Sequence, residues 1–321
     1  MSAPAAFVLA AGLGTRLAPL TDILPKPLVP VFQKPLLTFA LDSLLAAGVG
    51  TLALNTHHLP GAFEEEFGKE PSYRDRPLHL FHEPLLLDTG GGIRNARAAL
   101  GDSTFVLYNG DILADLPIAE LLAAHRASGA LATMLLRPAE GGGVANVRFD
   151  PSSGRVLDLR GVLGVTDGDL AVYSGVAVFE PAIMERIPES GPYSIIESLL
   201  SALRAGQKVG GMIASEGLWI DLGTPESYLR AHQLFADPTT RPCYVCDASW
   251  PSPVHPDARV ASGALLEGVV AVGSCAVIES GAVVRDSVIW PGSVIRSDAR
   301  IEGCVVSGVK PVSGTFKGGV I

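Results

Sequence analysis

Residues 9 to 30 read Leu9-Ala-Ala-Gly12-Leu-Gly14-Thr-Arg16-Leu-Ala-Pro-Leu-Thr-Asp-Ile-Leu-Pro25-Lys26-Pro27-Leu-Val-Pro30. They follow an apolar run over residues 7–9, which is typical of a buried parallel strand. Gly12 and Gly14 permit positive φ and lack a Cβ, so several backbone N–H groups can turn toward one anion. Arg16 offers a planar charged fork for phosphate oxygens. The prolines around Lys26 favour an extended, stiff backbone, and the stretch therefore predicts a phosphate site after the first strand.

Two better-known glycine motifs do not fit this stretch. The dinucleotide fingerprint needs a third glycine where Leu17 stands, and the P-loop needs a Gly-Lys-Ser/Thr that does not follow. The string instead resembles the signature of the sugar-1-phosphate nucleotidyltransferases, which runs Gly-x-Gly-Thr-Arg, then Pro-Leu-Thr, then Pro-Lys-Pro-Leu. The resemblance implies that an NTP and a sugar 1-phosphate give an NDP-sugar and pyrophosphate. It also implies that Arg16 meets the triphosphate and that Lys26 meets the α-phosphate.

Composition limits the class of protein. The chain has 321 residues, of which 48% are hydrophobic and 18% charged, so we expect a globular protein with one large and one smaller domain. A net charge of −9 argues against a nucleic-acid partner. No apolar run reaches the roughly 20 residues of a membrane helix, and we expect no membrane partner and a cytoplasmic location. Cys243 and Cys246 form a lone pair, for which a reduced structural role is favoured over zinc.

Apolar runs alternate with helix-like stretches from residue 5 to about 236. We expect strands over residues 7–9, 51–55, 78–81, 105–108 and 131–136, and helices over residues 36–47, 61–67, 91–100 and 118–128. Such alternation predicts an α/β, Rossmann-like fold with a mostly parallel sheet and helices on both faces. In that architecture ligands lie beyond the carboxyl ends of the strands, which is where the loop containing Gly12 falls.

The C-terminal segment has a period of six residues. Aliphatic residues recur at that spacing, with one five-residue step after the fifth, at Val260, Leu266, Val272, Ile278, Val284, Ile289, Ile295 and Ile301. A helix of 3.6 residues per turn would scatter these positions, whereas a parallel β-helix points them all inward. The segment resembles the left-handed hexapeptide β-helix of several nucleotidyltransferases, and we expect fewer than three coils.

The pattern divides the chain into three predicted parts. They are a nucleotidyltransferase domain at 1–236, a proline-rich linker at 237–256 and a left-handed β-helix at 257–321. Some hexapeptide domains transfer acyl groups, but His255 precedes the first repeat. An assembly or regulatory role for the β-helix is therefore favoured, and it allows a homo-oligomer.

Two aspartates are the predicted metal ligands. Nucleotidyl transfer needs a divalent cation, and magnesium prefers a few carboxylates. Asp111 comes just after the strand over residues 105–108, and Asp221 lies in Trp219-Ile-Asp-Leu-Gly223 before a helix start. Each aspartate alone is typical of a turn or cap. Together they match the two metal ligands of the family, which implies Mg²⁺ as the cofactor and a catalytic set of Arg16, Lys26, Asp111 and Asp221.

The remaining candidate residues surround the two substrates. The three glycines of Asp88-Thr-Gly-Gly-Gly-Ile-Arg94 stand at a helix start, where N–H groups can receive polar ligand atoms. This loop looks most like that of N-acetylmuramate-1-phosphate uridylyltransferases, and other motifs look like mannose-1-phosphate guanylyltransferases, so UTP or GTP is the expected nucleotide. The resemblance implies sugar contacts at Gly175 and Glu197, and nucleotide contacts at Ala11, Gly12, Gly14, Thr15, Glu83, Thr89, Gly90 and Asn109.

One family element is absent. Many relatives carry Glu-Lys-Pro after a Gly-Arg-Val stretch, and the lysine meets the sugar phosphate. Here Gly154-Arg-Val-Leu-Asp-Leu-Arg160 contains no lysine, so Arg160 is the candidate substitute. Two other functions stay open: an inactive paralogue that binds nucleotide sugar and regulates a partner through its β-helix, and acyl transfer by the β-helix itself.

Overall fold

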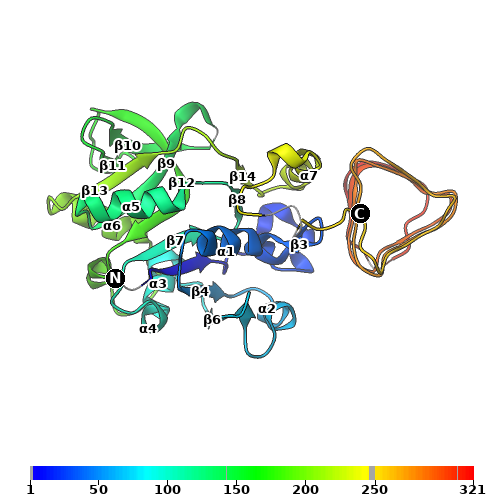
Figure 1. Cartoon of the computed structure of the whole chain (residues 1–321), viewed down its shortest axis with the longest axis horizontal. Helices are drawn as coiled ribbons and strands as arrows, with labels where there is room; N and C mark the ends of the chain where they lie inside the picture. The colour runs from blue at the N-terminus through cyan, green and yellow to red at the C-terminus, as the bar shows by residue number, and fades with distance from the viewer. Residues whose placement is uncertain (1–2, 142, 246–249, 309) are drawn as a thin grey trace. The chain divides into compact units, whose positions relative to one another are not determined.

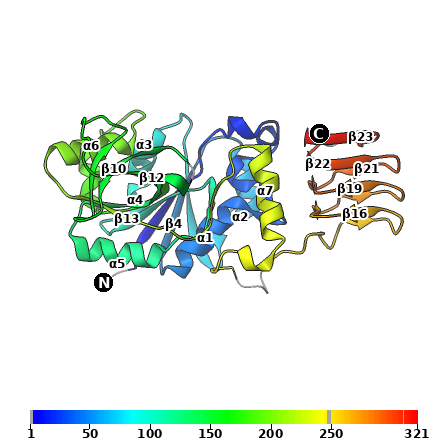
Figure 2. The same cartoon turned by 90° about the horizontal axis from the view of Figure 1, so that it is seen from above.

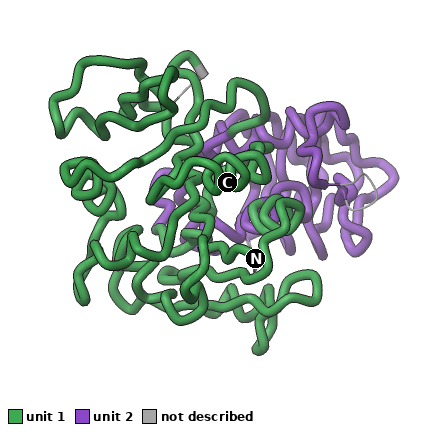
Figure 3. Tube along the Cα trace, turned by 60° about the vertical axis from the view of Figure 1, so that its left-hand side comes forward, with its two compact units in different colours: residues 1–12, 40–219 green, residues 13–39, 220–321 purple. Residues whose placement is uncertain are grey.

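The computed structural model describes residues 3–141, 143–245, 250–308 and 310–321. The chain forms two compact units (Figure 3): unit 1 runs through Gly12 and from Ala40 to Trp219, and unit 2 contains Leu13–Phe39 and Ile220–Ile321. Neither unit begins or ends at residue 236, where the nucleotidyltransferase domain is predicted to end. The division into three parts therefore stays a prediction. No helix among the described residues is long and apolar enough to cross a membrane.

Unit 1 is built on a ten-stranded sheet in the order β10-β11-β13-β9-β12-β7-β1-β4-β6-β5. The strands are β1 Ala5–Leu9, β4 Thr51–Thr56, β5 Ser72–Tyr73, β6 Arg76–His82, β7 Phe105–Asn109, β9 Ala132–Pro138, β10 Ala145–Asp150, β11 Arg155–Leu159, β12 Asp169–Phe179 and β13 Val209–Ile213. All five predicted strands are present. Strands β7, β1, β4 and β6 are parallel, as expected, but β12 runs antiparallel to both β7 and β9. The sheet is mixed because β10 and β12, which follow β9, pair in the antiparallel direction: β10 with β11 and β12, and β12 with β7 and β9.

Helices cover both faces of this sheet. They are α2 Pro60–Phe67, α3 Asp88–Asn95, α4 Arg97–Leu100, α5 Ile118–Ser128 and α6 Ile195–Arg204, while α1 Leu36–Ala46 crosses the boundary between the units. The helix predicted over 91–100 is two helices, α3 and α4. Phe7 shares a core with Ile93 of α3 and Leu199 of α6. Its neighbour Val8 points to the opposite face and is also fully buried. Figure 2 shows α5 on the side of the sheet opposite α3 and α6.

The strand order positions the loops that matter for binding. From β1 the chain moves outward to β4 and β6, and β7 then returns to the other side of β1. Loops after β1 and β7 therefore leave in opposite directions, and in α/β sheets ligands bind beyond the carboxyl ends of the strands at such a reversal. Leu9 pairs with Asn109 at this edge. The beginning of the glycine loop consequently lies beside residues 109–111.

The first part of unit 2 is a series of short turns, a hairpin and one helix. Its elements are η1 Thr15–Leu17, η2 Leu20–Asp22, η3 Lys26–Leu28, β2 Pro30–Val31, β3 Lys34–Pro35, α7 Pro225–Phe235 and η6 Pro238–Thr240. Helix α7 begins with a capping box in which the side chains of Thr224 and Ser227 each bond the other residue's backbone. Shorter elements elsewhere are η4 Ala139–Gly141, η5 Pro181–Arg186, β8 Ile112–Ala114 and β14 Trp219–Asp221.

The rest of unit 2 fits a three-sided parallel β-helix, and Figure 1 shows its triangular outline end-on. Its strands are β15 Arg259–Val260, β16 Leu265–Glu267, β17 Ala271–Val272, β18 Val277–Ile278, β19 Val283–Arg285, β20 Val288–Ile289, β21 Val294–Ile295, β22 Arg300–Val306 and β23 Thr315–Val320. Arg259 pairs with Val277, 18 residues later, and Val277 pairs with Val294, only 17 later. The shortening comes from the five-residue step noted in the sequence.

The inward aliphatic positions were predicted correctly. Val272, Ile278, Val284, Ile289, Ile295 and Ile301 are each at most 2% exposed. The expected number of coils was too low, because β16, β19, β22 and β23 stack on one face, as Figure 2 shows. Strand β23 lies after the last hexapeptide counted in the sequence, and its pairing with β22 adds the extra layer.

Candidate functional site

Three of the four predicted catalytic residues meet within unit 2. The Asp221 carboxylate accepts from both cations: its Oδ1 lies 3.3 Å from Lys26 Nζ, and its Oδ2 lies 3.2 Å from an Arg16 guanidinium nitrogen. The side chain of Lys26 is only 6% exposed, whereas that of Arg16 is 66% exposed. A buried ammonium and an exposed guanidinium are thus held together by one carboxylate from about 200 residues away in the sequence.

Gly14 is the glycine that this arrangement requires. Its φ of +63° lies in the left-handed region, and it caps the η1 turn that carries Arg16. A Cβ on Gly14 would come 2.9 Å from Lys26 Cβ and 2.9 Å from Thr21 Cγ2. Gly12 differs from the prediction, because its φ is not positive and nothing lies within 4 Å of an added Cβ. The fold therefore requires glycine at position 14, whereas position 12 has room for a side chain.

The backbone at Lys26 also differs from the prediction. Lys26 begins the single 3₁₀ turn η3, whereas the extended conformation belongs to Pro25, with φ −55° and ψ 140°. The stiffness expected from the prolines remains, since Pro25 and Pro27 fix the backbone on either side. Burial of Lys26, Pro27 and Leu28 adds to it.

A third glycine, Gly223, lets Arg16 approach the backbone. A Cβ on Gly223 would lie 2.9 Å from three guanidinium atoms of Arg16. Gly223 stands between Asp221 and the Thr224 cap of α7. The guanidinium therefore lies flat against the segment that supplies its own carboxylate partner, a role that the Trp-x-Asp-x-Gly pattern did not reveal.

In unit 1 a buried network holds the start of the glycine loop. The Ala10 N–H donates to Asn55 Oδ1 at 2.7 Å, and Asn55 Nδ2 donates to Glu83 Oε1 at 2.8 Å. Glu83 Oε2 accepts from the Leu87 N–H at 3.0 Å, and Glu83 is 1% exposed. Both of its oxygens thus have protein partners, and contact of Glu83 with a nucleotide stays a prediction. The sequence analysis did not predict a role for Asn55, because a single polar residue near the end of an apolar strand matches no motif of the family.

The triple-glycine loop is used differently from the expectation. The N–H groups of Gly90 and Gly91 both donate to Tyr193 O, at 2.8 and 3.0 Å, so they bind protein rather than offering free donors. The Thr89 hydroxyl accepts from the Ile195 N–H at 2.8 Å. These bonds connect α3 with the first turn of α6, where Glu197 is exposed. Nucleotide contacts at Thr89 and Gly90 and a sugar contact at Glu197 stay predictions.

Asn109, Asp111 and Gly175 gather where β7 ends. Gly175 has φ +89° at an irregularity of β12, and its added Cβ would lie 3.1 Å from the Asn109 side chain. The Gly110 N–H donates to Leu9 O at 2.9 Å, which fixes the half-buried Asp111 just beyond the ends of β1 and β7. On the β1 side Ala11 is buried, and in unit 2 Thr15 is exposed at the start of η1.

Candidate metal donors are few. Within the described ranges, no group of three or more His, Cys, Asp or Glu side chains is arranged to hold a metal ion. Asp111 belongs to unit 1 and Asp221 to unit 2, so their sharing of one ion stays a prediction. Cys246 lies outside the described residues, and the Cys243–Cys246 pair is therefore not tested.

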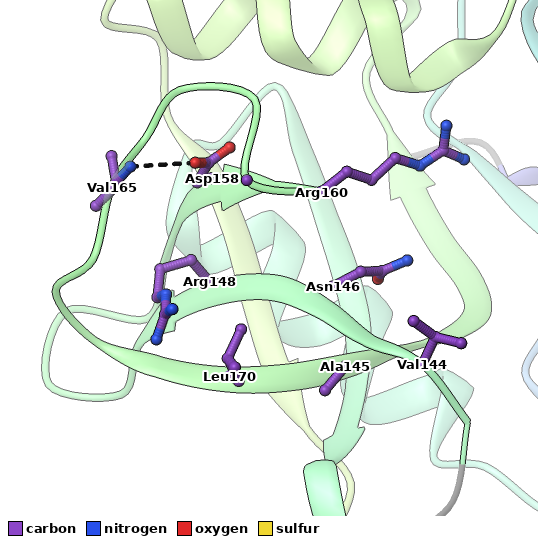
Figure 4. A pocket seen from close by; sticks show the side chains of 9 residues that line it. Val144, Ala145, Asn146, Arg148, Asp158, Arg160, Val165 and Leu170 are labelled. Carbon is purple, nitrogen blue, oxygen red and sulfur yellow. Dashed lines mark hydrogen bonds between the residues drawn. The ribbon is translucent and has the colours of Figure 1, made fainter.

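A cavity of about 370 Å³ lies over β10, β11 and the loop after them. Arg160, exposed with φ +57°, follows β11, and its N–H donates to Asn146 O at 2.6 Å. Figure 4 shows its side chain extending to the side on which Asn146 also points. Asp158 holds the loop by accepting from the N–H groups of Leu163 and Val165.

An arginine that the sequence did not single out lies on β9. The Arg137 guanidinium stacks over the Trp219 ring, 4.9 Å from its centroid, and Trp219 Nε1 donates to Ser174 O at 2.7 Å. One guanidinium nitrogen of Arg137 is buried and has no hydrogen-bond partner among the described residues. Burial lowers the pKa of Arg137 below its ordinary value. The Trp219 ring thus contacts the Arg137 cation on its face and the Ser174 carbonyl through its N–H.

A buried histidine fixes the hairpin of unit 2 to α7. His232 Nε2 accepts from the Phe32 N–H at 2.8 Å, and its Nδ1 donates to Tyr228 O at 3.0 Å. This pattern requires the neutral ring. Burial lowers the pKa of His232 to about 4, consistent with that state.

Known proteins match most of this chain. The family described as Nucleotidyl transferase matches residues 5–237. The chain is similar to a mannose-1-phosphate guanylyltransferase of Mycobacterium tuberculosis, with 33% identity covering 94% of this chain and 82% of the relative. It is also similar to a UTP–glucose-1-phosphate uridylyltransferase of Synechocystis, with 26% identity and the same two coverages. A catalytic subunit beta of mannose-1-phosphate guanylyltransferase from Dictyostelium discoideum shares 31% identity over 72% of this chain and 64% of the relative.

The two loop glycines provide a matched test of the local geometry. Gly14→Ala should lower the free energy of unfolding by about 1–3 kcal/mol, because the residue must hold a left-handed φ against Lys26. Gly12→Ala should change it by less than about 0.5 kcal/mol, since the position is open. Urea unfolding of both variants measures the difference. Equal losses would contradict the distinction.

Stability should fall on acidification because of His232. The unfolded chain binds this proton near pH 6.5 and the folded one only near pH 4, so protonation in that window favours unfolding. Stability contributed by the neutral ring is complete above pH 6.5 and decreases as pH falls toward 4, by up to about 3 kcal/mol. His232→Gln, which keeps an acceptor for the Phe32 N–H, should flatten unfolding free energy measured between pH 7.5 and 4. An unchanged slope in the variant would rule out His232 as the source.

Proposed function

The chain belongs to the nucleotidyl transferase family, and on that premise we propose that it makes an NDP-sugar and pyrophosphate from an NTP and a sugar 1-phosphate. The observation that carries this proposal is the meeting of Arg16, Lys26 and Asp221 beside a glycine loop. Relatives named for this reaction use GTP or UTP, which supports the same activity here. No observation favours the inactive paralogue or acyl transfer.

The reaction needs positioning and charge stabilisation. A sugar phosphate oxygen attacks the α-phosphorus, the bond from that phosphorus to the bridging oxygen breaks, and pyrophosphate leaves. The attacking oxygen is already anionic, so no base is required. Lys26 would contact the α-phosphate and Arg16 the β- and γ-phosphates, where charge gathers as pyrophosphate departs. Asp221 would keep both cations close to the site before the substrate binds. Orientation of the two reacting groups contributes up to about 7–11 kcal/mol in favourable cases.

The donor set fits a divalent metal. Family members generally depend on one, and carboxylate oxygens are the donors that Mg²⁺ prefers. Asp221 is 37% exposed and so accessible to an ion, and Asp111 is half-buried at the carboxyl end of β7. We propose that these two side chains hold Mg²⁺, which would neutralise phosphate charge when bound. Lys26 and Arg16 would then turn from Asp221 to the phosphates.

The finer assignments are also proposals. UTP or GTP is the expected nucleotide, because relatives named for guanylyl transfer and for UTP each match 94% of this chain. Arg160 is the proposed substitute for the absent lysine at the sugar phosphate, with Gly175 and Glu197 on the sugar. The β-helix is proposed to be left-handed and to support a homo-oligomer. A cytoplasmic location stays a prediction.

The direct test is a matrix of four NTPs against a panel of sugar 1-phosphates, read by pyrophosphate release with Mg²⁺. Turnover with UTP or GTP and one sugar 1-phosphate is expected. Nucleotide-sugar binding without turnover in any combination would favour the inactive paralogue.

Asp111→Asn should lower kcat at least about 100-fold, equivalent to about 2.7 kcal/mol of transition-state stabilisation. The amide keeps the shape of the side chain but is a much weaker metal ligand. Asp102→Asn, at an exposed aspartate in the turn before β7, is the matched control and should retain activity. Near-normal turnover of Asp111→Asn would remove the metal assignment.

Arg160→Ala should raise the KM for the sugar 1-phosphate about 10-fold and leave the KM for the NTP unchanged, since a charge-assisted hydrogen bond contributes about 1.5–3 kcal/mol. Arg155→Ala, at an exposed arginine that begins the strand preceding Arg160, controls for general loss of positive charge. Equal effects of the two variants would argue against a specific role for Arg160.

A further inference from the structure

Trp290 connects the β-helix to α7 within unit 2. It follows β20, is 3% exposed, and its Nε1 donates to the Tyr228 hydroxyl at 3.1 Å. Tyr228 belongs to α7, is fully buried, and donates its hydroxyl hydrogen to Pro30 O. A phenol has one hydrogen to donate and lone pairs to accept with, so the two bonds form a directed series. Each bond in such a series strengthens the next by polarisation.

The acceptor at the end of this series is close to the catalytic lysine. Pro30 begins β2 two residues after the η3 turn that carries Lys26. The turn is short and proline-bounded, so displacement of Pro30 would be transmitted to Lys26 rather than absorbed. Burial raises the pKa of Tyr228, which keeps its hydroxyl protonated and able to donate.

The hairpin has a second link to the β-helix. Gln33 Nε2, between β2 and β3, donates to Val272 O at 2.9 Å and to Pro253 O at 3.2 Å. Val272 belongs to β17, and Pro253 lies in the segment before β15, where its neighbour Val254 bridges to Val272. The hairpin after Lys26 is therefore bonded both to α7 and to the β-helix.

The partner of Lys26 is connected to the same helix. Asp221 lies three residues before the Thr224 cap, and the Tyr228 N–H donates to Thr224 O at 3.0 Å in the first turn of the helix. Tyr228 thus lies one turn from the cap that follows Asp221 and contacts the hairpin that follows Lys26. The Lys26 and Asp221 side chains, 3.3 Å apart, are thus each carried by a segment that is joined to α7.

We propose that Trp290 is a positioning residue for Lys26, acting through the Tyr228 hydroxyl and Pro30, so that the β-helix sets the geometry of the phosphate-binding cations. This inference rests on the proposed function, in which Lys26 contacts the α-phosphate. It assigns the β-helix a role within a single chain, separate from any part in assembly. Displacement of about 1 Å at a reacting group can cost about 100-fold in rate, so a loosened lysine should be measurable.

The experiment compares Trp290→Phe, Tyr228→Phe and the double variant in the full chain. Each single change removes one hydrogen-bonding group and keeps an aromatic ring. Ile295→Val, in the β-helix core and absent from this series, is the control for lower β-helix stability. Two readouts are taken: kcat by pyrophosphate release, and the rate at which an amine-selective acylating reagent labels Lys26 relative to Lys69, an exposed lysine of unit 1, measured by mass spectrometry.

Both single variants should lower kcat about 10-fold and raise Lys26 labelling at least about 3-fold, while Ile295→Val should change neither. The double variant should resemble Tyr228→Phe alone, because Trp290 acts only through that hydroxyl. Unchanged labelling in Trp290→Phe, or effects that add in the double variant, would overturn the proposal. Absence of turnover in the unmodified protein would count against the proposed function instead, and the labelling rates would still decide whether Trp290 positions Lys26.

Discussion

The Asp221 carboxylate, held between the Lys26 ammonium and the Arg16 guanidinium, is the interaction around which unit 2 is organised. Two cations so close together would repel each other and cost free energy without a shared anion. Burial of Lys26 makes that anion more necessary still, since an unpaired ammonium away from water is strongly unfavourable. The close approaches at Gly14 and Gly223 follow from this arrangement, because no side chain fits where the cations lie.

The surrounding structure keeps the ion pair in place through helix α7. One turn of this helix carries Tyr228 and the next His232, and both bond to the backbone of the hairpin that follows Lys26. The β-helix completes the packing through Trp290. The β-helix thus buries its own core and also stabilises the hairpin that follows Lys26. Its backbone carbonyl at Val272 accepts from Gln33, and its Trp290 side chain donates to Tyr228.

Unit 1 contributes a different element, the point where strand order reverses. The parallel pairing of β1 with β7 ends at Leu9 and Asn109. Asn55 and Glu83 satisfy the groups next to β1, and the Asn109–Gly175 contact closes the side toward β12. The polar residues Asn55, Glu83 and Asn109 at this edge therefore complete the fold through contacts with the protein itself.

The sequence by itself determined the features that depend on local periodicity and on contiguous motifs. The alternating strands and helices through Ser128, the inward aliphatic positions of the β-helix and its five-residue step all follow from spacings of 2, 3.6 or 6 residues. Arg16, Lys26 and Asp221 were identified because they stand in continuous strings. Only the tertiary structure decided the antiparallel half of the sheet, the left-handed backbone at Gly14 rather than Gly12, the use of the Gly90 and Gly91 N–H groups by Tyr193, and the series from Trp290 to Pro30. These depend on contacts between residues far apart in the chain, and no local pattern records which buried donor will meet which acceptor.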